Sequence, residues 1–250
     1  MAGAAVLRRL TWQVARVAEL VDETAQTRTI ALEPPDWRGH RAGQHVDVRL
    51  TAEDGYQAQR SYSIASAPEQ ERLEITVERL PDGEVSTYLV GELRSGDGLE
   101  LRGPIGGYFV WEAADGGPLL LLAGGSGVVP LMAMSRHRAL VGSDVPTRLV
   151  YSSRTIDDVI YREELGRLAA GGTGFEVVQT LTRAQPAGWT GYSRRVDADL
   201  LQETAWPAAD SPLAYVCGPT SFVEVCAAGL VDLGYEPERI KTERFGPTGG

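Results

Sequence analysis

The sequence has little of what marks a disulfide-rich or metal-binding protein. Only two cysteines, Cys217 and Cys226, occur in 250 residues. Two cysteines exclude a disulfide framework, and they cannot supply the four thiolates that hold a typical iron–sulfur centre. The three histidines, His40, His45 and His137, are scattered and follow no metal-ligand spacing. We therefore expect no bound metal and interpret the histidines as structural or surface groups.

Long apolar runs and excess positive charge are also missing. No window approaches the roughly 18 consecutive apolar residues of a membrane span, and the apolar run in residues 1–10 is too short for a signal peptide. The net charge of −10 argues against a general nucleic-acid or anionic-membrane surface. A cytoplasmic protein without a membrane span or a nucleic-acid partner is expected, with a monomer as the default.

What is present is an ordinary globular composition, 43% hydrophobic and 23% charged, with enough length for one large or two small domains. The first half shows short alternating apolar runs separated by glycine, proline and aspartate. The strands expected from these runs are residues 12–17, 27–32, 45–50, 60–64, 73–78 and 98–102. Six such strands predict a small antiparallel barrel. Residues 86–93 interrupt the pattern and predict a short helix with Ser86 as its N-cap.

The pattern changes after Phe109, where residues 113–118 resemble a linker. Beyond them, continuous apolar runs alternate with helical periods, which is typical of parallel strands covered on both faces. The expected strands are residues 119–123, 147–151, 175–179, 213–217 and 240–245, and the expected helices are residues 129–141, 161–169 and 221–233. This second half predicts a doubly wound α/β domain, with residues 1–112 as the first domain and 113–250 as the second.

One stretch of the first half, residues 60–66, carries groups that suit a flavin nucleotide. Strand alternation places Arg60 and Tyr62 on one face, with Ser61 and Ser63 on the other. An arginine fork matches phosphate oxygens, a tyrosine ring can stack on an isoalloxazine, and a serine hydroxyl can donate to or accept from its N5. Taken alone, the stretch also fits an ordinary half-buried strand.

A glycine-rich turn, residues 124–130, joins a predicted buried strand to a predicted helix. Such a turn lets backbone N–H groups and the positive helix end approach a pyrophosphate closely. Glycines also serve simple tight turns, so the flanking strand and helix supply the context that favours a dinucleotide site.

Five motifs occur in order, and together they are more specific than any one of them. They are residues 60–66, 83–86, 103–107, 125–130 and 217–219. This order resembles the ferredoxin–NADP reductase family over roughly residues 10 to 245, without an iron–sulfur domain. The resemblance implies an FAD-binding antiparallel barrel followed by an NAD(P)-binding domain.

Site residues follow from matching this sequence to the family's motifs. For FAD the resemblance implies Arg60, Ser61, Tyr62, Ser63, Ala65, Ser66, Gly83, Val85, Ser86 and Phe245. For the nicotinamide nucleotide it implies Gly125, Ser126, Gly127, Pro130, Tyr192, Cys217, Gly218 and Pro219. Ser153, Arg154 and Arg183 join them because they follow predicted parallel strands, where an adenosine ribose would lie. Ser63, Cys217 and Glu243 are the candidate catalytic residues, with Cys217 beside the nicotinamide rather than acting as a nucleophile. Unlike plant-type reductases, the C-terminal aromatic residue is Phe245, and five residues follow it.

Two cofactor choices depend on phosphate groups. FAD has a pyrophosphate for the helix that begins near Ser86 and FMN has none, which favours FAD, although Ser86 also fits a plain N-cap. Arg154 and Arg183 follow the second and third predicted parallel strands, where cations would meet a 2′-phosphate. NADPH is therefore preferred over NADH. The alternative is that Arg154 pairs with Asp157 or Asp158.

The resemblance implies an enzyme, an NAD(P)H-dependent flavoprotein reductase. It would accept hydride from NADPH on flavin N5 and pass electrons to a separate ferredoxin, flavodoxin or oxygenase component. A partner of acidic charge would need a basic patch, for which the candidates are Arg8, Arg9, Arg16, Arg38, Arg41, Arg94 and Arg102. The alternatives are a reductase of free flavin, quinone or other small acceptors, and a flavin-binding subunit or sensor without catalysis.

Overall fold

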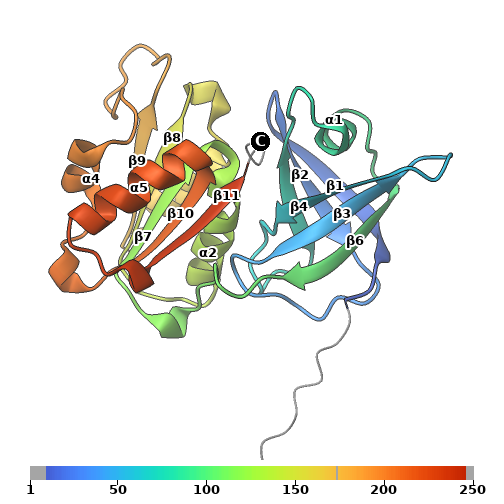
Figure 1. Ribbon diagram of the computed structural model, residues 1–250, viewed down its shortest axis with the longest axis horizontal. Helices are drawn as coiled ribbons and strands as arrows, with labels where there is room; N and C mark the ends of the chain where they lie inside the picture. The colour runs from blue at the N-terminus through green and yellow to red at the C-terminus, as the bar shows by residue number, and fades with distance from the viewer. Residues whose placement is uncertain (1–9, 173, 246–250) are drawn as a thin grey trace, which may run out of the picture.

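The computed structural model describes residues 10–172 and 174–245, which form two sheets side by side (Figure 1). Strands of the first sheet are β1 Gln13–Thr24, β2 Thr27–Glu33, β3 His45–Thr51, β4 Gln57–Ser63, β5 Leu73–Glu78 and β6 Gly98–Ile105. Their order is β4-β3-β6-β1-β2-β5, and neighbouring strands are antiparallel.

The first sheet closes on itself. Ile64, directly after β4, forms an antiparallel bridge with Ile75 of β5, so the two outermost strands of the sheet meet. Alternate residues such as Val46 and Val48 point inward and are fully buried, as strand periodicity requires. The predicted six-stranded barrel is confirmed.

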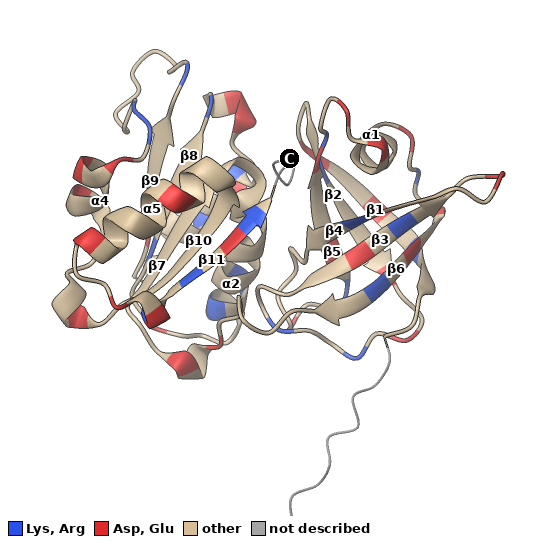
Figure 2. Ribbon diagram, in the orientation of Figure 1, with Lys and Arg blue, Asp and Glu red and all other residues tan. Residues whose placement is uncertain are grey.

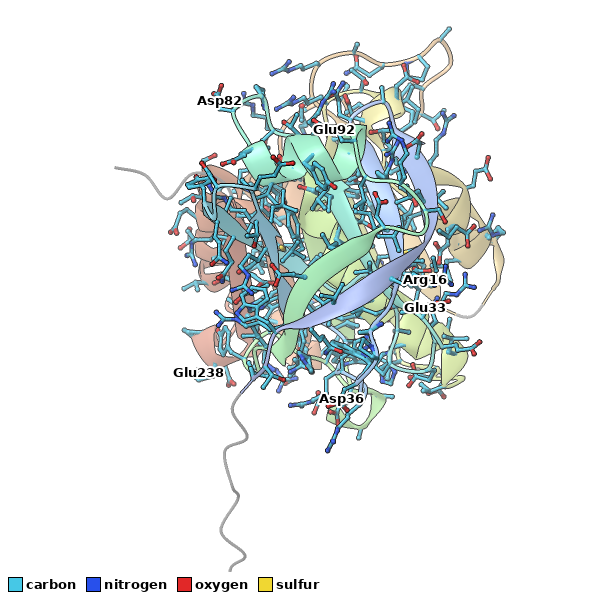
Figure 3. All side chains as sticks on the ribbon, turned by 90° about the vertical axis from the view of Figure 1, so that its right-hand side faces the viewer. Arg16, Glu33, Asp36, Asp82, Glu92 and Glu238 are labelled. Atoms are coloured by element: carbon cyan, nitrogen blue, oxygen red, sulfur yellow. The ribbon has the colours of Figure 1, made fainter. Side chains whose placement is uncertain are left out.

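Opposite charges face each other across neighbouring strands on the outside of the barrel. Arg16 of β1 lies opposite Glu33 of β2, with 2.6 Å between Nη2 and Oε2, and Figure 3 shows the two side chains together. Arg49 of β3 likewise lies opposite Glu100 of β6, at 2.8 Å. Ion pairs on the outer surface add little free energy, but like charges at these positions would oppose the register.

The second sheet is entirely parallel. Its strands are β7 Leu119–Gly124, β8 Thr147–Ser153, β9 Phe175–Leu181, β10 Leu213–Pro219 and β11 Ile240–Phe245, in the order β11-β10-β7-β8-β9. The helices that cover it are α2 Val128–Leu140, α3 Arg162–Ala170, α4 Ala198–Thr204 and α5 Thr220–Asp232.

Successive residues of the parallel strands point to opposite faces of the sheet. Leu121 and Leu149 pack with α2 and α3, whereas Leu120, Leu122 and Val150 pack with α4 and α5. Both faces are therefore apolar, which is why these strands appear as continuous hydrophobic runs in the sequence. The predicted doubly wound α/β arrangement is confirmed.

The structure adds to or changes the local predictions at three places. The helix expected over residues 86–93 is α1, Glu84–Gly91, and its N-cap is Gly83 rather than Ser86. Helix α4 was not predicted, although Asp197 caps it by accepting a hydrogen bond from the Leu200 N–H at 2.9 Å. The expected linker contains a 3₁₀ turn, Ala113–Asp115, that is closed by a capping box from Glu112.

The segment before the predicted linker packs with the second sheet. Phe109 contacts the Tyr215 ring edge-on at 5.3 Å between centroids, and the Tyr215 hydroxyl donates to the Val110 carbonyl at 2.6 Å. Trp111 is fully buried in the same core cluster. The domain division at residues 112 and 113 stays a prediction. Within residues 10–172 and 174–245, no helix has the length and apolar character to cross a membrane.

Candidate functional site

A cavity of about 650 Å³ lies between the barrel and the parallel sheet. Clefts of this size at a domain interface are typical cofactor sites. Its lining comes from β4, β5, the start of α1 with the turn before it, the glycine-rich loop with the start of α2, β10 and β11. The predicted site residues that line it are Arg60, Ser61, Tyr62, Ser63, Gly83, Val85, Ser86, Ser126, Cys217 and Phe245.

A larger hollow, about 830 Å³, lies on the barrel beside α1. It shares Pro81, Asp82 and Gly83 with the first cavity, and Gly83 is its only predicted site residue. The smaller cavity is the better candidate site because groups from both sheets converge on it.

Arg60 presents a cation to the cavity. Its guanidinium donates to the Gln59 carbonyl at 2.7 Å, and no carboxylate pairs with it in the described part of the chain. The guanidinium therefore keeps donors for a phosphate group. The neighbouring Ser61 is different: its hydroxyl donates to Asp47 Oδ1 at 2.6 Å and so ties β4 to β3.

Tyr62 and Ser63 end β4 at the cavity. Tyr62 is half-buried, its ring packs against the barrel core, and burial raises the pKa of its hydroxyl. The phenol therefore stays protonated at neutral pH. Ser63 is opposite His45 in the β3–β4 register. These positions fit the predicted stacking and hydrogen-bonding roles, which stay predictions.

Ala65 and Ser66 lie behind the cavity rather than in it. Both are fully buried. The Ser66 hydroxyl accepts from the Glu74 N–H at 3.0 Å, while the Ser66 carbonyl lies 2.9 Å from His40 Nε2. These contacts hold the bend after β4, so the two residues support β4 and do not line the cavity.

Ser86 also has an internal role. Its hydroxyl accepts from the Leu80 N–H and donates to the Gly83 carbonyl, both at 3.1 Å. A Cβ on Gly83 would lie 2.3 Å from this oxygen, so a larger residue there would displace the Ser86 hydroxyl. Because the hydroxyl is engaged in closing the turn, a pyrophosphate here would meet the backbone N–H groups that begin α1.

The glycine-rich loop is a 3₁₀ turn, Gly125–Gly127, that leads directly into α2, with Pro130 as the helix's third residue. Gly125 has a left-handed φ of +55°, and nothing lies within 4 Å of the position of its missing Cβ. A Cβ on Gly127 would lie 2.1 Å from the Cys217 carbonyl oxygen. The loop therefore packs against β10 and leaves an open backbone cradle at a helix N-terminus, which fits a nucleotide pyrophosphate.

Cys217 and Glu243 are partners in the parallel register of β10 and β11. Burial, together with the Glu243 charge, raises the pKa of the Cys217 thiol, so it stays a neutral thiol. Burial also raises the pKa of Glu243 to about 7, and its Oε2 atom is buried with no hydrogen-bond partner in the described chain. Glu243 does not line the cavity, although the next two residues, Arg244 and Phe245, do.

The predicted adenosine-end residues lie away from the cavity, at the ends of β8 and β9. Ser153 is buried, whereas Arg154 and Arg183 are exposed and adjacent, since the Arg183 N–H donates to the Arg154 carbonyl at 2.9 Å. The alternative pairing of Arg154 is wrong: Asp158 instead accepts from the Thr155 N–H and hydroxyl, and Arg154 forms no ion pair within the described ranges.

Tyr192 is already engaged within the second half of the chain. Its hydroxyl donates to Glu203 Oε2 at 2.8 Å, and the Arg194 guanidinium lies 5.6 Å from its ring centroid. Gly218 and Pro219 follow Cys217 at the end of β10, where Gly218 packs against the Phe222 ring. The nucleotide contacts predicted for all three residues stay predictions.

Several cavity residues were missed by sequence reasoning. They are Thr76, Glu78, Leu80, Pro81, Asp82, Val129 and Arg244. Leu80, Pro81 and Asp82 directly precede the motif at residues 83–86. Their position beside this motif was the signal that could have identified them as cavity residues. Thr76 and Glu78 share one face of β5 by alternation, but nothing local shows that β5 reaches the same cavity as β4.

Known proteins match both halves of the chain. A family model described as an oxidoreductase FAD-binding domain matches residues 15–110, and one described as an oxidoreductase NAD-binding domain matches residues 121–228. NADH-cytochrome b5 reductase 1 of Emericella nidulans is 31% identical over 214 residues, which is 82% of this chain and 68% of that protein.

The chain belongs to the ferredoxin–NADP reductase family. Another member of comparable likeness is the glycine betaine monooxygenase reductase subunit of Chromohalobacter salexigens, 32% identical over 93% of this chain. The chain spans only 64% of that relative's length. The flavohem-like FAD/NAD-binding domain of a Vibrio cholerae nitric oxide dioxygenase superposes with a TM-score of 0.84 at 25% identity, covering 94% of this chain and 99% of that one.

Membership of this reductase family agrees with the chemistry of the cleft. An FAD-binding barrel supplies Arg60 and the β4 serines, and an NAD-binding sheet supplies the glycine loop and Cys217. The expected family, fold and cofactor classes, FAD and a nicotinamide nucleotide, are confirmed.

Proposed function

We propose that this chain is an FAD-dependent NAD(P)H oxidoreductase that passes electrons to a separate redox protein. The observation that carries the proposal is the shared cavity, because Arg60 and Tyr62 of the barrel line it together with Ser126 and Cys217 of the parallel sheet. A site that joins both nucleotide-binding halves suits transfer between two bound cofactors. When bound, FAD supplies N5 as the hydride acceptor and can release electrons singly or in pairs.

Residues of the barrel would hold FAD. The Arg60 guanidinium would pair with its pyrophosphate, together with the first N–H groups of α1, and the Tyr62 ring would stack on its isoalloxazine. The Ser63 hydroxyl would hydrogen-bond near N5. The C-terminal Phe245 ring also lines the cavity and would cover the flavin until nicotinamide enters.

Residues of the parallel sheet would place the nucleotide. The cradle at Gly125 to Pro130 would bind its pyrophosphate, and Cys217 would lie beside the nicotinamide without reacting covalently, because its thiol stays neutral. The Glu243 carboxyl, with its raised pKa of about 7, can hold a proton at Oε1 or Oε2 near neutral pH. Glu243 stays a predicted proton donor, and because its side chain lies outside the cavity lining, it would act only through a neighbouring group.

The preferred nucleotide is NADPH. Exposed Arg154 and Arg183 lie side by side at the ends of β8 and β9, and neither forms an ion pair within residues 10–172 and 174–245. Two unpaired guanidinium groups at this edge of the sheet offer donors to a 2′-phosphate. NADH remains the second nucleotide to test.

The acceptor is a ferredoxin, a flavodoxin or an oxygenase component in the main proposal, in line with the relative named as a monooxygenase reductase subunit. One observation favours the alternative of a small acceptor. Four of the predicted patch arginines form ion pairs, Arg16 with Glu33, Arg38 with Asp36, Arg41 with Glu112 and Arg102 with Asp47. Acidic residues, red on the ribbon in Figure 2, are spread over both halves.

Ionic strength separates these two acceptors, because charge-steered docking weakens with salt and reduction of a neutral quinone does not.

The other arginines of the predicted basic patch are Arg94, Arg8 and Arg9. Arg94 donates to backbone carbonyls, and Arg8 and Arg9 lie outside the described residues. A cytoplasmic location remains part of the proposal.

An anaerobic titration tests the proposal. Protein reconstituted with FAD is titrated with NADPH and, separately, with NADH while the visible spectrum is recorded. Bleaching of the flavin band by stoichiometric nucleotide is expected. A stable oxidised band with both nucleotides would contradict hydride transfer and favour a flavin-binding subunit or sensor, and failure to bind FAD would contradict the assignment of β4.

A further inference from the structure

A closed ring of hydrogen bonds joins the parallel sheet to the barrel. The Tyr161 hydroxyl, from the turn before α3, donates to Thr76 Oγ1 of β5, which lies 2.8 Å from Thr29 Oγ1 of β2. The Thr29 hydroxyl contacts Glu23 Oε1 at 2.8 Å, and Glu23 Oε2 accepts from the Tyr161 N–H at 3.3 Å. Tyr161 therefore closes the ring through both its hydroxyl and its backbone N–H, and the other members of the ring come from β1, β2 and β5 of the barrel.

Tyr161 adopts an unusual conformation to make this ring. Its φ of +58° is left-handed, which aromatic residues rarely adopt. Its side chain is buried, as are Thr29 and Thr76. Strain of this kind persists where surrounding contacts require it, and the requirement here is a contact between the two halves of the chain.

Arg136 of α2 makes a second connection beside the ring. Its guanidinium donates to the Ala65 carbonyl at 2.9 Å and to Glu74 Oε2 at 3.0 Å, both in the barrel, and it pairs with Glu164 of α3 at 2.7 Å. It also lies 4.9 Å from the Tyr161 ring centroid. Only 12% of the Arg136 side chain is exposed, so these charge-assisted bonds are shielded from water.

Both connections end at the parts of the molecule that would bind cofactors. Thr76 lines the cavity. Ala65 follows by two residues the strand β4, Gln57–Ser63, which would hold the flavin and is called the flavin strand here. Helix α2 begins at the glycine-rich loop, and Arg136 lies eight residues into it, a rise of about 12 Å from Val128. The hydrogen bonds of Arg136 therefore connect the nucleotide cradle, through a rigid helix, to the end of the flavin strand.

We propose that Arg136 and Tyr161 are positioning residues that fix the glycine-rich loop and Cys217 relative to the flavin strand. Neither side chain lines the cavity, so neither touches a cofactor. Their role is to set the spacing between the nicotinamide and flavin sites, which controls the rate of hydride transfer but not nucleotide binding. This inference rests on the proposed reductase function.

Stopped-flow reduction of the FAD-loaded protein by NADPH tests it. We expect Tyr161→Phe and Arg136→Gln each to lower the limiting rate of flavin bleaching by about tenfold, since an error of 1 Å in placement can cost roughly 100-fold. The half-saturating NADPH concentration should stay within about twofold of wild type, because the cradle itself is intact. Arg136→Lys keeps the charge and should recover part of the rate.

Tyr235→Phe is the matched control. The Tyr235 hydroxyl donates a hydrogen bond to the Trp206 carbonyl at 2.7 Å. This variant therefore also removes a buried tyrosine hydrogen bond, but both partners of that bond lie in the second half of the chain. Its limiting rate should equal that of wild type. Unchanged rates in folded Tyr161→Phe and Arg136→Gln, or an equal fall in Tyr235→Phe, would overturn the proposal.

Amide hydrogen exchange without nucleotide supplies a readout that does not depend on catalysis. Faster exchange at residues 73–78 and 125–130 is expected in Tyr161→Phe and not in Tyr235→Phe. Equal exchange in both variants would overturn the positioning role. If NADPH and NADH both fail to reduce wild type, the proposed function fails, and the exchange comparison still decides whether these residues hold the two sites together.

Discussion

Glu243 lies next to Cys217 in the β10–β11 register, and its Oε2 atom is buried without a hydrogen-bond partner in the described residues. Burial raises the pKa of the Glu243 carboxyl to about 7 and, with the Glu243 charge, raises the pKa of the Cys217 thiol. Protonated, the two groups form an uncharged pair on adjacent strands, with Cys217 in the cavity wall and Glu243 outside it. A neutral environment of this kind disfavours negative charge at the end of β10.

Glu243→Gln should change how stability depends on pH. The folded carboxyl has a pKa of about 7 against 4.5 for the ordinary group, so the folded state binds the extra proton between these values. The free energy of unfolding is therefore undiminished by this carboxyl below about pH 4.5. It falls by at most about 3 kcal/mol as the pH rises toward 7. Urea unfolding at about pH 5 and pH 8 should show the variant gaining stability relative to wild type at the higher pH.

The exposed Glu53→Gln serves as the control for this measurement, because its side chain lies on the surface. Wild type and Glu243→Gln with parallel pH profiles would mean that Glu243 is not buried as a neutral acid.

Arg60→Ala should weaken FAD binding. The guanidinium lines the cavity and has no carboxylate partner in the described chain, so its removal takes a cation from the phosphate site. Hydrogen bonds to charged groups contribute about 1.5–3 kcal/mol, which predicts a 10- to 100-fold higher Kd. Fluorescence titration of apoprotein with FAD measures it. Arg79→Ala, an exposed arginine whose side chain contacts Gln26 and does not line the cavity, should leave the Kd unchanged. Equal Kd values for both variants would exclude an Arg60–phosphate contact.

Gly127→Ala should damage the nucleotide cradle. The new Cβ would lie 2.1 Å from the Cys217 carbonyl oxygen and 2.8 Å from the Gly218 nitrogen, both backbone atoms that cannot move aside cheaply. We expect a loss of about 1–3 kcal/mol in the free energy of unfolding, measured in urea. Gly166→Ala, on α3 with open space around it, should instead be neutral or stabilising. Similar effects from both substitutions would contradict the close packing of the loop on β10.

Replacing Arg154 and Arg183 together by alanine should reduce the preference for NADPH. Both guanidinium groups are exposed and free of ion pairs in the described ranges, so their loss leaves a 2′-phosphate without cations. The ratio of kcat/KM for NADPH to that for NADH should fall at least about tenfold, chiefly through KM for NADPH. Arg167→Ala, on the exposed face of α3, is the control. An unchanged ratio would place the 2′-phosphate elsewhere.

Most of the fold could be predicted because the pattern of burial is local. Leu120 and Leu121 point to opposite faces of a covered sheet, which makes β7 a continuous apolar run, and alternation in β3 places Val46 and Val48 inside the barrel. Helix α4 was missed since it is only seven residues long, although its Asp197 cap was visible in the sequence.

The site was predictable where a motif and its chemistry coincide, and less so where side chains have partners far along the chain. Arg60, Tyr62, Ser126 and Cys217 meet in one cavity as their motifs suggested. The hydroxyl of Ser61 is taken by Asp47, a contact 14 residues away that alternation cannot reveal.

The hydrogen bond from Tyr161 to Thr76 joins residues 85 positions apart, and the left-handed backbone at Tyr161 carries no glycine signal. Contacts of this kind arise only when the two halves dock, so no pattern within either half predicts them.

The most direct test of hydride transfer in the cleft is a primary deuterium isotope effect on flavin reduction. NADPH carrying deuterium at C4 on either one face or the other is mixed anaerobically with the FAD-loaded protein. Because the nucleotide would be held in one orientation by the Gly125 to Pro130 cradle and Cys217, deuterium on one face should slow bleaching severalfold and deuterium on the other should have almost no effect. Equal rates with both labelled nucleotides and unlabelled NADPH would contradict direct transfer between two cofactors aligned in this cavity.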